Sequence, residues 1–192
     1  MHPAEQRRSP RHEELLEQAY QYALEHGLAD LSLRPLATAI GSSPRVLLFL
    51  FGSKDGLIRA LLARARTDEL TVLDRARAET GHDDLATAAR AIWRWLRAEP
   101  HRPLLTLWAE SYAQSLAHPD GPWADFARRT VEDWLDILGS AQPAARRRSK
   151  TGIAERTLAL SVLRGALLDL LATGDAERTT AAVEHHLRLS ST

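Results

Sequence analysis

Residues 32–54, SLRPLATAIGSSPRVLLFLFGSK, constrain the fold more than any other stretch of the chain. The positions of serine, proline and glycine in this stretch indicate two short helices joined by a tight turn. Ser32 stands where the first helix would be capped, and Gly41 stands where a left-handed residue commonly ends one. Ser43 and Pro44 then supply a cap and a first-turn proline, so a second helix begins within a few residues. This spacing predicts a helix-turn-helix, the motif that places its second helix in the major groove of DNA.

The second helix and its neighbours carry the side chains expected to contact DNA. Arg45 could pair with a guanine, while Leu48 and Phe49 could contact thymine methyl groups. Arg34 and Lys54 stand near helix starts, where basic side chains and helix N-termini together can bind phosphate. The predicted DNA-binding residues are Arg34, Ser43, Arg45, Leu48, Phe49 and Lys54.

The order of elements around this motif resembles the N-terminal domain of the TetR family of bacterial transcriptional regulators. The resemblance covers roughly residues 11–62 and implies a homodimeric, ligand-responsive DNA-binding protein. Two positions depart from the family pattern, because the family usually has Tyr and His where this chain has Leu48 and Leu50. The resembling residues are Ala19, Gly27, Leu31, Ser32, Leu33, Arg34, Leu36, Ala37, Gly41, Ser43, Leu47, Phe51, Ser53, Lys54 and Leu57.

Composition narrows the fold class and weakens a simple electrostatic argument for DNA binding. The 192 residues are 44% hydrophobic, include no cysteine and show no persistent alternating pattern, so an all-α fold is expected. The net charge is zero, so basic and acidic side chains must be sorted onto different faces. The chain start lacks an apolar signal region, and the longest apolar run is interrupted by charges. A cytoplasmic location without membrane contact is therefore expected.

The sequence predicts three segments. Residues 1–53 form the helix-turn-helix domain, residues 54–80 a connecting helix, and residues 81–192 a ligand-binding and dimerisation domain. Residues 1–10 form a flexible arm with Arg7 and Arg8, and Arg11 follows just beyond it. This arm is either a disordered terminus or a contact to DNA.

All five tryptophans lie between residues 93 and 134. They are either ordinary core residues or part of a hollow that holds an apolar or aromatic small molecule. Glu110 and His101 are candidates, together with Tyr112, for the polar groups that would orient such a ligand. The pocket candidates are Trp93, Leu96, Trp108, Tyr112, Trp123, Phe126 and Trp134.

A long helix over residues 153–173 has almost no polar side, so two of its surfaces must be covered. One surface can pack in its own domain, and a symmetry mate is the best explanation for the other. The TetR resemblance implies that the last two long helices form a four-helix dimer interface. The dimer-interface candidates are Leu163, Gly165, Leu167, Leu170 and Leu187.

The resulting hypothesis is a homodimeric transcriptional regulator, a repressor released from a near-palindromic operator by a small apolar or aromatic ligand. An activator on the same fold, or a helical adaptor that binds proteins rather than DNA, remains open. An enzyme is disfavoured, because no phosphate-binding glycine loop, nucleophile elbow or paired-carboxylate spacing occurs. No cofactor or metal is expected, since His185 and His186 are adjacent and point apart on a helix.

Overall fold

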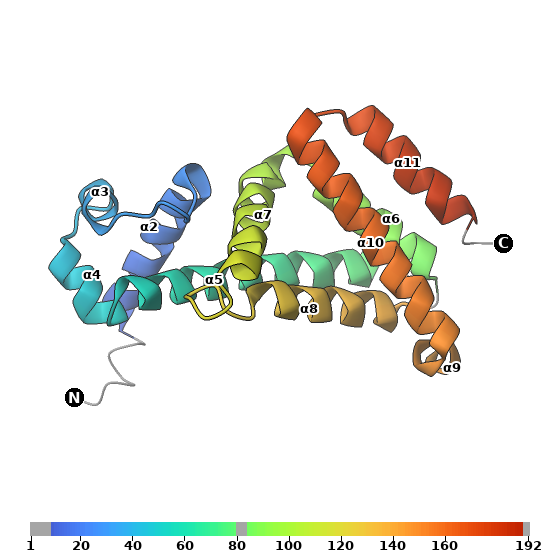
Figure 1. The fold of residues 1–192 in the computed structure, drawn as a ribbon, viewed down its shortest axis with the longest axis horizontal. Coiled ribbons are helices and arrows are strands. Elements are labelled where there is room, and N and C mark those ends of the chain that lie inside the picture. Colours follow the sequence, from blue (N-terminus) through green and yellow to red (C-terminus); the bar gives the residue numbers. More distant parts are fainter. Residues whose placement is uncertain (1–8, 80–83, 190–192) are drawn as a thin grey trace. The chain divides into compact units, whose positions relative to one another are not determined.

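The computed structural model describes residues 9–79 and 84–189, and the regular elements within these ranges are all helical (Figure 1). The expected all-α fold is therefore confirmed. Arg7 and Arg8 of the predicted arm lie outside the described residues. The elements are α2 (Pro10–His26), α3 (Leu33–Ala39), α4 (Pro44–Phe51), α5 (Lys54–Glu79), α6 (Leu85–Leu96), the 3-10 helix η1 (Glu99–His101), α7 (Arg102–Ala117), α8 (Phe126–Ser140), α9 (Ala144–Arg148), α10 (Lys150–Thr173) and α11 (Ala176–Leu189).

The predicted helix-turn-helix is formed by α3 and α4. The Ser43 hydroxyl accepts a hydrogen bond from the Val46 N–H at 3.3 Å, and Pro44 occupies the first turn of α4. Gly41 has φ +60°, the left-handed conformation expected at the end of α3. Ser32 occupies the N-cap position of α3, but its side chain makes no capping hydrogen bond there. Leu36 and Leu47 are buried with 0% and 1% exposure, so each short helix is anchored by an apolar side chain.

Helix α2 supports this motif and is joined to α5 by a polar contact. Its inner side is apolar, with Leu15, Ala19 and Ala23 fully buried. Arg64 of α5 donates to Glu17 of α2 at 2.9 Å and also pairs with Asp68. The same guanidinium lies 4.8 Å from the centre of the Tyr20 ring. Burial, reinforced by Asp68, raises the pKa of the Tyr20 hydroxyl, so this side chain stays neutral.

The chain divides into two compact units that do not follow its order. Unit 1 contains Met1–Asp68 and Pro103–Ala127, and unit 2 contains Glu69–Arg102 and Arg128–Thr192. The segments predicted from the sequence, with boundaries at residues 53 and 80, follow one another along the chain. The two units instead group nearly all of α7 with the helix-turn-helix. Helix α5 contributes residues to both units.

Unit 2 is built on α6, α10 and α11, and Figure 1 shows α10 and α11 alongside each other. Gly174, with φ +71°, ends α10, and Arg178 of α11 donates to Asp169 of α10 at 2.7 Å. Trp93 of α6 donates its Nε1–H to Thr180 of α11 at 3.0 Å. The buried Trp134 donates to Glu69 within the same unit. Both tryptophans are thus hydrogen-bonded core residues.

The segments on either side of α8 have distinct local structures. Helix α8 begins at Phe126, directly after Asp125 with φ +64°. The basic segment that follows α8 forms the short helix α9. Arg147 donates from this helix to the carbonyl oxygens of Gly139 and Ser140 at 2.7 and 2.9 Å. These bonds fix the basic segment to the end of α8.

Candidate nucleic-acid interface and ligand site

Helix α4 presents an apolar surface that none of the described residues of unit 1 covers. Phe49 is 70% exposed and Leu48 is 41% exposed. Leu47, the residue before them in α4, is buried. Arg45 is exposed on the same helix. The structure therefore places three of the predicted DNA-binding residues on the free side of α4. Ser43 is half-buried, and its hydroxyl is engaged as the helix cap.

The remaining two predicted DNA-binding residues lie on neighbouring helices. Arg34 is exposed in the first turn of α3, and Lys54 is exposed at the first residue of α5. The N-terminus of α5 is capped by Ser53, which accepts from the Gly56 N–H at 2.9 Å. By contrast, Arg11 is engaged with Glu14 at 2.8 Å. These positions suit Arg34 and Lys54 to phosphate contacts beside α4.

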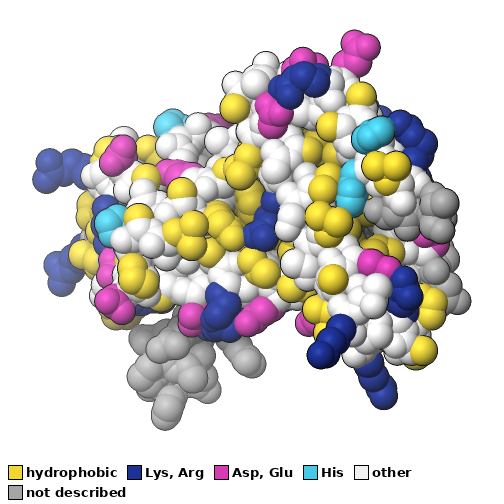
Figure 2. All heavy atoms as spheres, turned by 45° about the vertical axis from the view of Figure 1, so that its right-hand side comes forward, with side chains coloured by type: hydrophobic (Ala, Val, Ile, Leu, Met, Phe, Trp, Pro, Cys, Tyr) yellow, Lys and Arg dark blue, Asp and Glu magenta, His cyan; other side chains and the backbone are white. Residues whose placement is uncertain are grey.

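The segment of the chain that contains α4 has no excess of positive charge. Residues 1–60 contain seven basic and seven acidic side chains. On the face drawn in Figure 2, basic and acidic side chains are interspersed with hydrophobic ones. DNA binding by this chain would therefore depend on a few placed contacts more than on a broad positive field.

The seven predicted pocket residues fall in both units. Trp93, Leu96 and Trp134 lie in unit 2 and are buried with 1–2% exposure. The members in unit 1 are Trp108, Tyr112, Trp123 and Phe126; Tyr112 is half-buried and the other three are buried. Trp93 and Trp134 have hydrogen-bond partners, which is what ordinary core residues require, whereas the third tryptophan of unit 2, Trp95, has a buried indole N–H without one.

Trp108 differs from Trp93 and Trp134 because its indole N–H is buried without a hydrogen-bond partner. Its ring lies 5.3 Å from that of Tyr112, one turn along α7, at a tilt of 39°. An unpaired buried donor costs about 1–3 kcal/mol, so this position favours a ligand or water that accepts a hydrogen bond.

Two of the three polar residues expected to orient a ligand, Glu110 and His101, are engaged elsewhere. The carboxylate of Glu110 accepts from the Leu28 N–H at 2.9 Å and from the Ala29 N–H at 2.6 Å. His101 stacks on Trp95 with ring centres 4.5 Å apart, and its Nδ1 lies 2.9 Å from the Trp95 carbonyl oxygen. The backbone partners of Glu110 and His101 could not be predicted from the sequence, which is why both residues were candidates for a ligand site.

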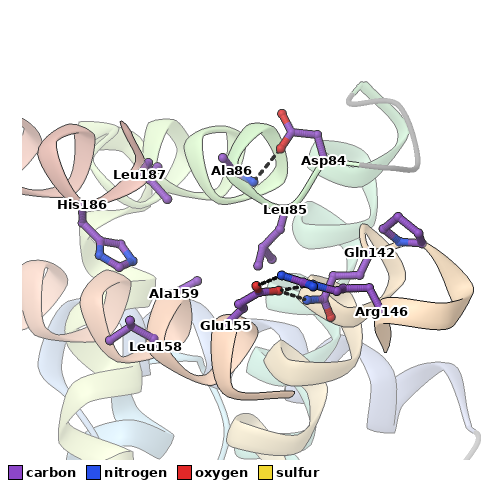
Figure 3. A pocket seen from close by; sticks show the side chains of 11 residues that line it. Asp84, Leu85, Ala86, Gln142, Arg146, Glu155, Leu158, Ala159, His186 and Leu187 are labelled. Atoms are coloured by element: carbon purple, nitrogen blue, oxygen red, sulfur yellow. Dashed lines mark hydrogen bonds and ion pairs between the residues drawn. The ribbon is translucent and has the colours of Figure 1, made fainter. Parts of the chain in front are cut away.

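Unit 2 contains a cavity of about 620 Å³ that the sequence did not indicate. Figure 3 shows its lining: α6 and α11 lie on one side, and α9 and α10 on the other. The charged residues Arg146 and Glu155 pair with each other, and Gln142 donates to the Gly152 carbonyl oxygen at 2.9 Å. The cavity is lined by Asp84, Leu85, Ala86, Gln142, Pro143, Arg146, Glu155, Leu158, Ala159, His186 and Leu187, so it contains none of the predicted pocket residues.

Four of the five predicted dimer residues are buried and the fifth is exposed. Leu163, Leu167, Leu170 and Leu187 are buried in unit 2 with 0–7% exposure, so they belong to the core of the subunit. Gly165 is exposed, and a Cβ added there would meet nothing within 4 Å. The free side of α10 instead carries Leu158, Ser161, Gly165, Leu168 and Ala172. The repeat of the α-helix places these residues on one face.

In residues 9–79 and 84–189, no three His, Asp or Glu side chains are grouped so that they could hold a metal ion. None of the helices in the same ranges is both long and apolar enough to cross a membrane.

The chain is similar in sequence to known transcriptional regulators and similar in fold to solved structures. No family model matches the chain. The HTH-type transcriptional regulator Rv1816 of Mycobacterium tuberculosis is 33% identical over 125 residues, which cover 61% of this chain and 51% of that protein. The chain thus spans about half the length of the curated relatives it matches. These relatives are named as HTH-type transcriptional regulators.

Solved structures share the fold over nearly the whole chain. A TetR transcriptional regulator from Legionella pneumophila superposes with a TM-score of 0.72 and 17% identity, covering 95% of this chain and 97% of that one. The multidrug binding protein EbrR, complexed with proflavin, gives a TM-score of 0.66 and 23% identity over 93% of this chain and 99% of that one. The chain therefore has the TetR fold that residues 11–62 predicted.

Proposed function

We propose that the chain is a DNA-binding transcriptional regulator of the TetR type, which binds a near-palindromic operator as a homodimer. The observation that carries this proposal is the exposed face of α4, where Arg45, Leu48 and Phe49 stand free on a helix-turn-helix. Large apolar side chains exposed on one short helix require a partner, and the major groove offers thymine methyl groups and guanine acceptors.

Dimerisation supplies the affinity that the low charge of unit 1 cannot. Two copies of α4 would enter major grooves one helical turn apart, about 34–36 Å, or a multiple of that distance. The free side of α10, with Leu158, Gly165 and Leu168, is the surface proposed for pairing. Leu158 and Leu168 are 53% and 51% exposed, and Gly165 would allow two backbones to approach closely.

We propose further that a small aromatic molecule releases the protein from its operator, which makes it a repressor. The unpaired indole N–H of Trp108 beside Tyr112 supports a ligand that is flat, apolar and able to accept a hydrogen bond. The structural neighbour EbrR, which binds proflavin, supports the same class of molecule.

The DNA-binding proposal is tested by selecting bound sequences from random duplexes of about 30 base pairs, long enough for two half-sites. We expect an inverted repeat to be enriched. The Arg45→Ala, Lys54→Ala double variant should then lower the slope of log K against log salt by about two. Arg59→Ala removes an exposed arginine of unit 1 outside α4 and serves as the matched control. Failure to enrich any sequence, with protein binding intact in the double variant, would favour the adaptor hypothesis.

Proflavin is the first probe for the ligand. Titrating it into the protein with the selected duplex should quench tryptophan fluorescence and weaken DNA binding together. Quenching that leaves DNA affinity unchanged would contradict release by this class of ligand.

A further inference from the structure

The carboxylate of Glu110 holds the turn that precedes the helix-turn-helix. Its two oxygens accept from two consecutive backbone N–H groups, those of Leu28 and Ala29, at 2.9 and 2.6 Å. These residues are 81 and 82 positions away in the sequence, and they connect the end of α2 to the start of α3. Hydrogen bonds to a charged acceptor are stronger and more directional than neutral ones. The contact therefore fixes both the distance and the orientation of α7 relative to this turn.

Gly27 provides the space for this contact. It has φ +77°, and a Cβ added there would lie 2.9 Å from one Glu110 oxygen. Its own N–H is used to close α2, by donating to the Ala23 carbonyl oxygen at 2.9 Å. The N–H groups of the next two residues both donate to the Glu110 carboxylate, Leu28 from a buried position and Ala29 from an exposed one.

The opposite side of α7 carries the aromatic pair. Successive residues of an α-helix are about 100° apart, so Glu110 points about 200° away from Trp108, while Trp108 and Tyr112 share a face. Trp108 is buried with an unpaired N–H, and its ring contacts that of Tyr112. All of these residues belong to unit 1. A single helix thus carries aromatic side chains on one face and the carboxylate that binds the turn on the other.

We propose that Glu110 is the positioning residue through which α7 sets the helix-turn-helix motif. A shift or rotation of α7 moves the carboxylate, and the Leu28 and Ala29 N–H groups carry that displacement into α3 and α4. The contribution of Glu110 to operator affinity rests on the proposed DNA-binding function, whereas its contact with the turn does not. Glu110 acts through backbone position and makes no contact with DNA.

The test begins with Glu110→Gln in the free protein, because this change keeps the size of the side chain and removes its charge. Amide exchange of Leu28 and Ala29 should become roughly tenfold faster or more, since two charge-assisted hydrogen bonds are weakened. Glu25→Gln, an exposed carboxylate near the end of α2, is the matched control and should leave both rates unchanged. Unchanged exchange of Leu28 and Ala29 in Glu110→Gln would overturn the inference.

The second measurement uses the duplex obtained by selection. Glu110→Gln, where it remains folded, should bind it at least about fivefold more weakly, because a looser turn must be ordered on binding. In the wild type, DNA should slow exchange in residues 105–113 of α7, and the variant should lose this response while keeping the one in α4. Glu110→Asp keeps the charge but shortens the side chain, and its affinity for the duplex should lie between those of the wild type and Glu110→Gln.

The two proposals fail in different ways. If no duplex is enriched, DNA binding fails while the exchange rates still report the Glu110 contact. If a duplex is bound with equal affinity by the wild type and a folded Glu110→Gln, the positioning role is wrong and the DNA-binding role stands. If DNA still slows amide exchange of α7 in Glu110→Gln, the positioning role is likewise wrong.

Discussion

Phe49→Ala separates DNA affinity from protein stability more cleanly than any other change in α4. The Phe49 side chain is 70% exposed, so the folded protein gains little from it. Its removal should change the free energy of unfolding by no more than about 0.5 kcal/mol. Any large effect on operator binding would then come from the lost contact with DNA.

The size of that effect follows from the exposed area. A phenylalanine side chain presents roughly 200 Å², so 70% exposure leaves about 140 Å² available to a partner. If DNA covers half of it, the loss is about 70 Å², or about 1.8 kcal/mol at about 25 cal/mol per Å². Operator affinity should therefore fall roughly 20-fold.

The assay is a titration of the selected duplex by fluorescence anisotropy at several salt concentrations. The salt slope should stay at the wild-type value, because no charge is removed, whereas Arg45→Ala should lower it by about one. Leu47→Ala is the matched control, since this neighbour is 1% exposed and its truncation should cost about 2–5 kcal/mol of stability.

Replacing thymine by uracil in the duplex removes only the methyl group and tests the partner of Phe49. We expect the substitution to weaken the wild type and to have little further effect on Phe49→Ala. Equal weakening of both proteins would show that Phe49 does not contact these methyl groups. An unchanged affinity of folded Phe49→Ala would refute the whole argument for α4.

Two further predictions concern unit 2. The pKa of Asp84 is lowered, chiefly by its hydrogen bond from Thr87, and Asp84 also caps α6 by accepting from the Ala86 N–H at 3.0 Å. Because its folded pKa lies below the unfolded value, its stabilisation is present above about pH 4 and is lost as the pH falls through the folded pKa. Asp84→Ala should cost about 1 kcal/mol in urea unfolding at pH 7, and less below pH 4; an equal cost at pH 3 would contradict the assignment. Leu168→Glu, on the free side of α10, should leave folding intact and convert dimer to monomer in light scattering, whereas Leu167→Ala should lower stability by about 2–5 kcal/mol. A Leu168→Glu protein that remains dimeric would exclude this face as the interface.

The helix-turn-helix could be predicted because its signals are local. Ser43 and Pro44 start α4, Gly41 ends α3, and each acts through backbone geometry within a few residues. The exposed side of α4 followed from the same pattern once Leu47 was placed inside. The physical causes of this part of the fold are all contained in one short segment.

The rest of the candidate sites depends on contacts between distant segments. Glu110 is a polar residue on an amphipathic helix, and nothing near it in sequence identifies Leu28 and Ala29 as its partners. The side of α10 that remains free was equally hidden, because a helix that is apolar all round does not reveal which leucines its own subunit covers. Leu163 and Leu167 are buried within their own subunit, whereas Gly165 is exposed on the free side of α10.

The grouping of α7 with the helix-turn-helix has a consequence for protein engineering. The unit that contains the helix-turn-helix is discontinuous, since residues 103–127 complete a unit begun by residues 1–68. A chimera that exchanges only the first 53 residues between regulators would leave Glu110 facing a foreign turn. A chimera designed for a new operator should therefore transfer α7 together with the N-terminal helices. Otherwise the recipient needs a carboxylate placed to accept from the two backbone N–H groups of the transferred turn.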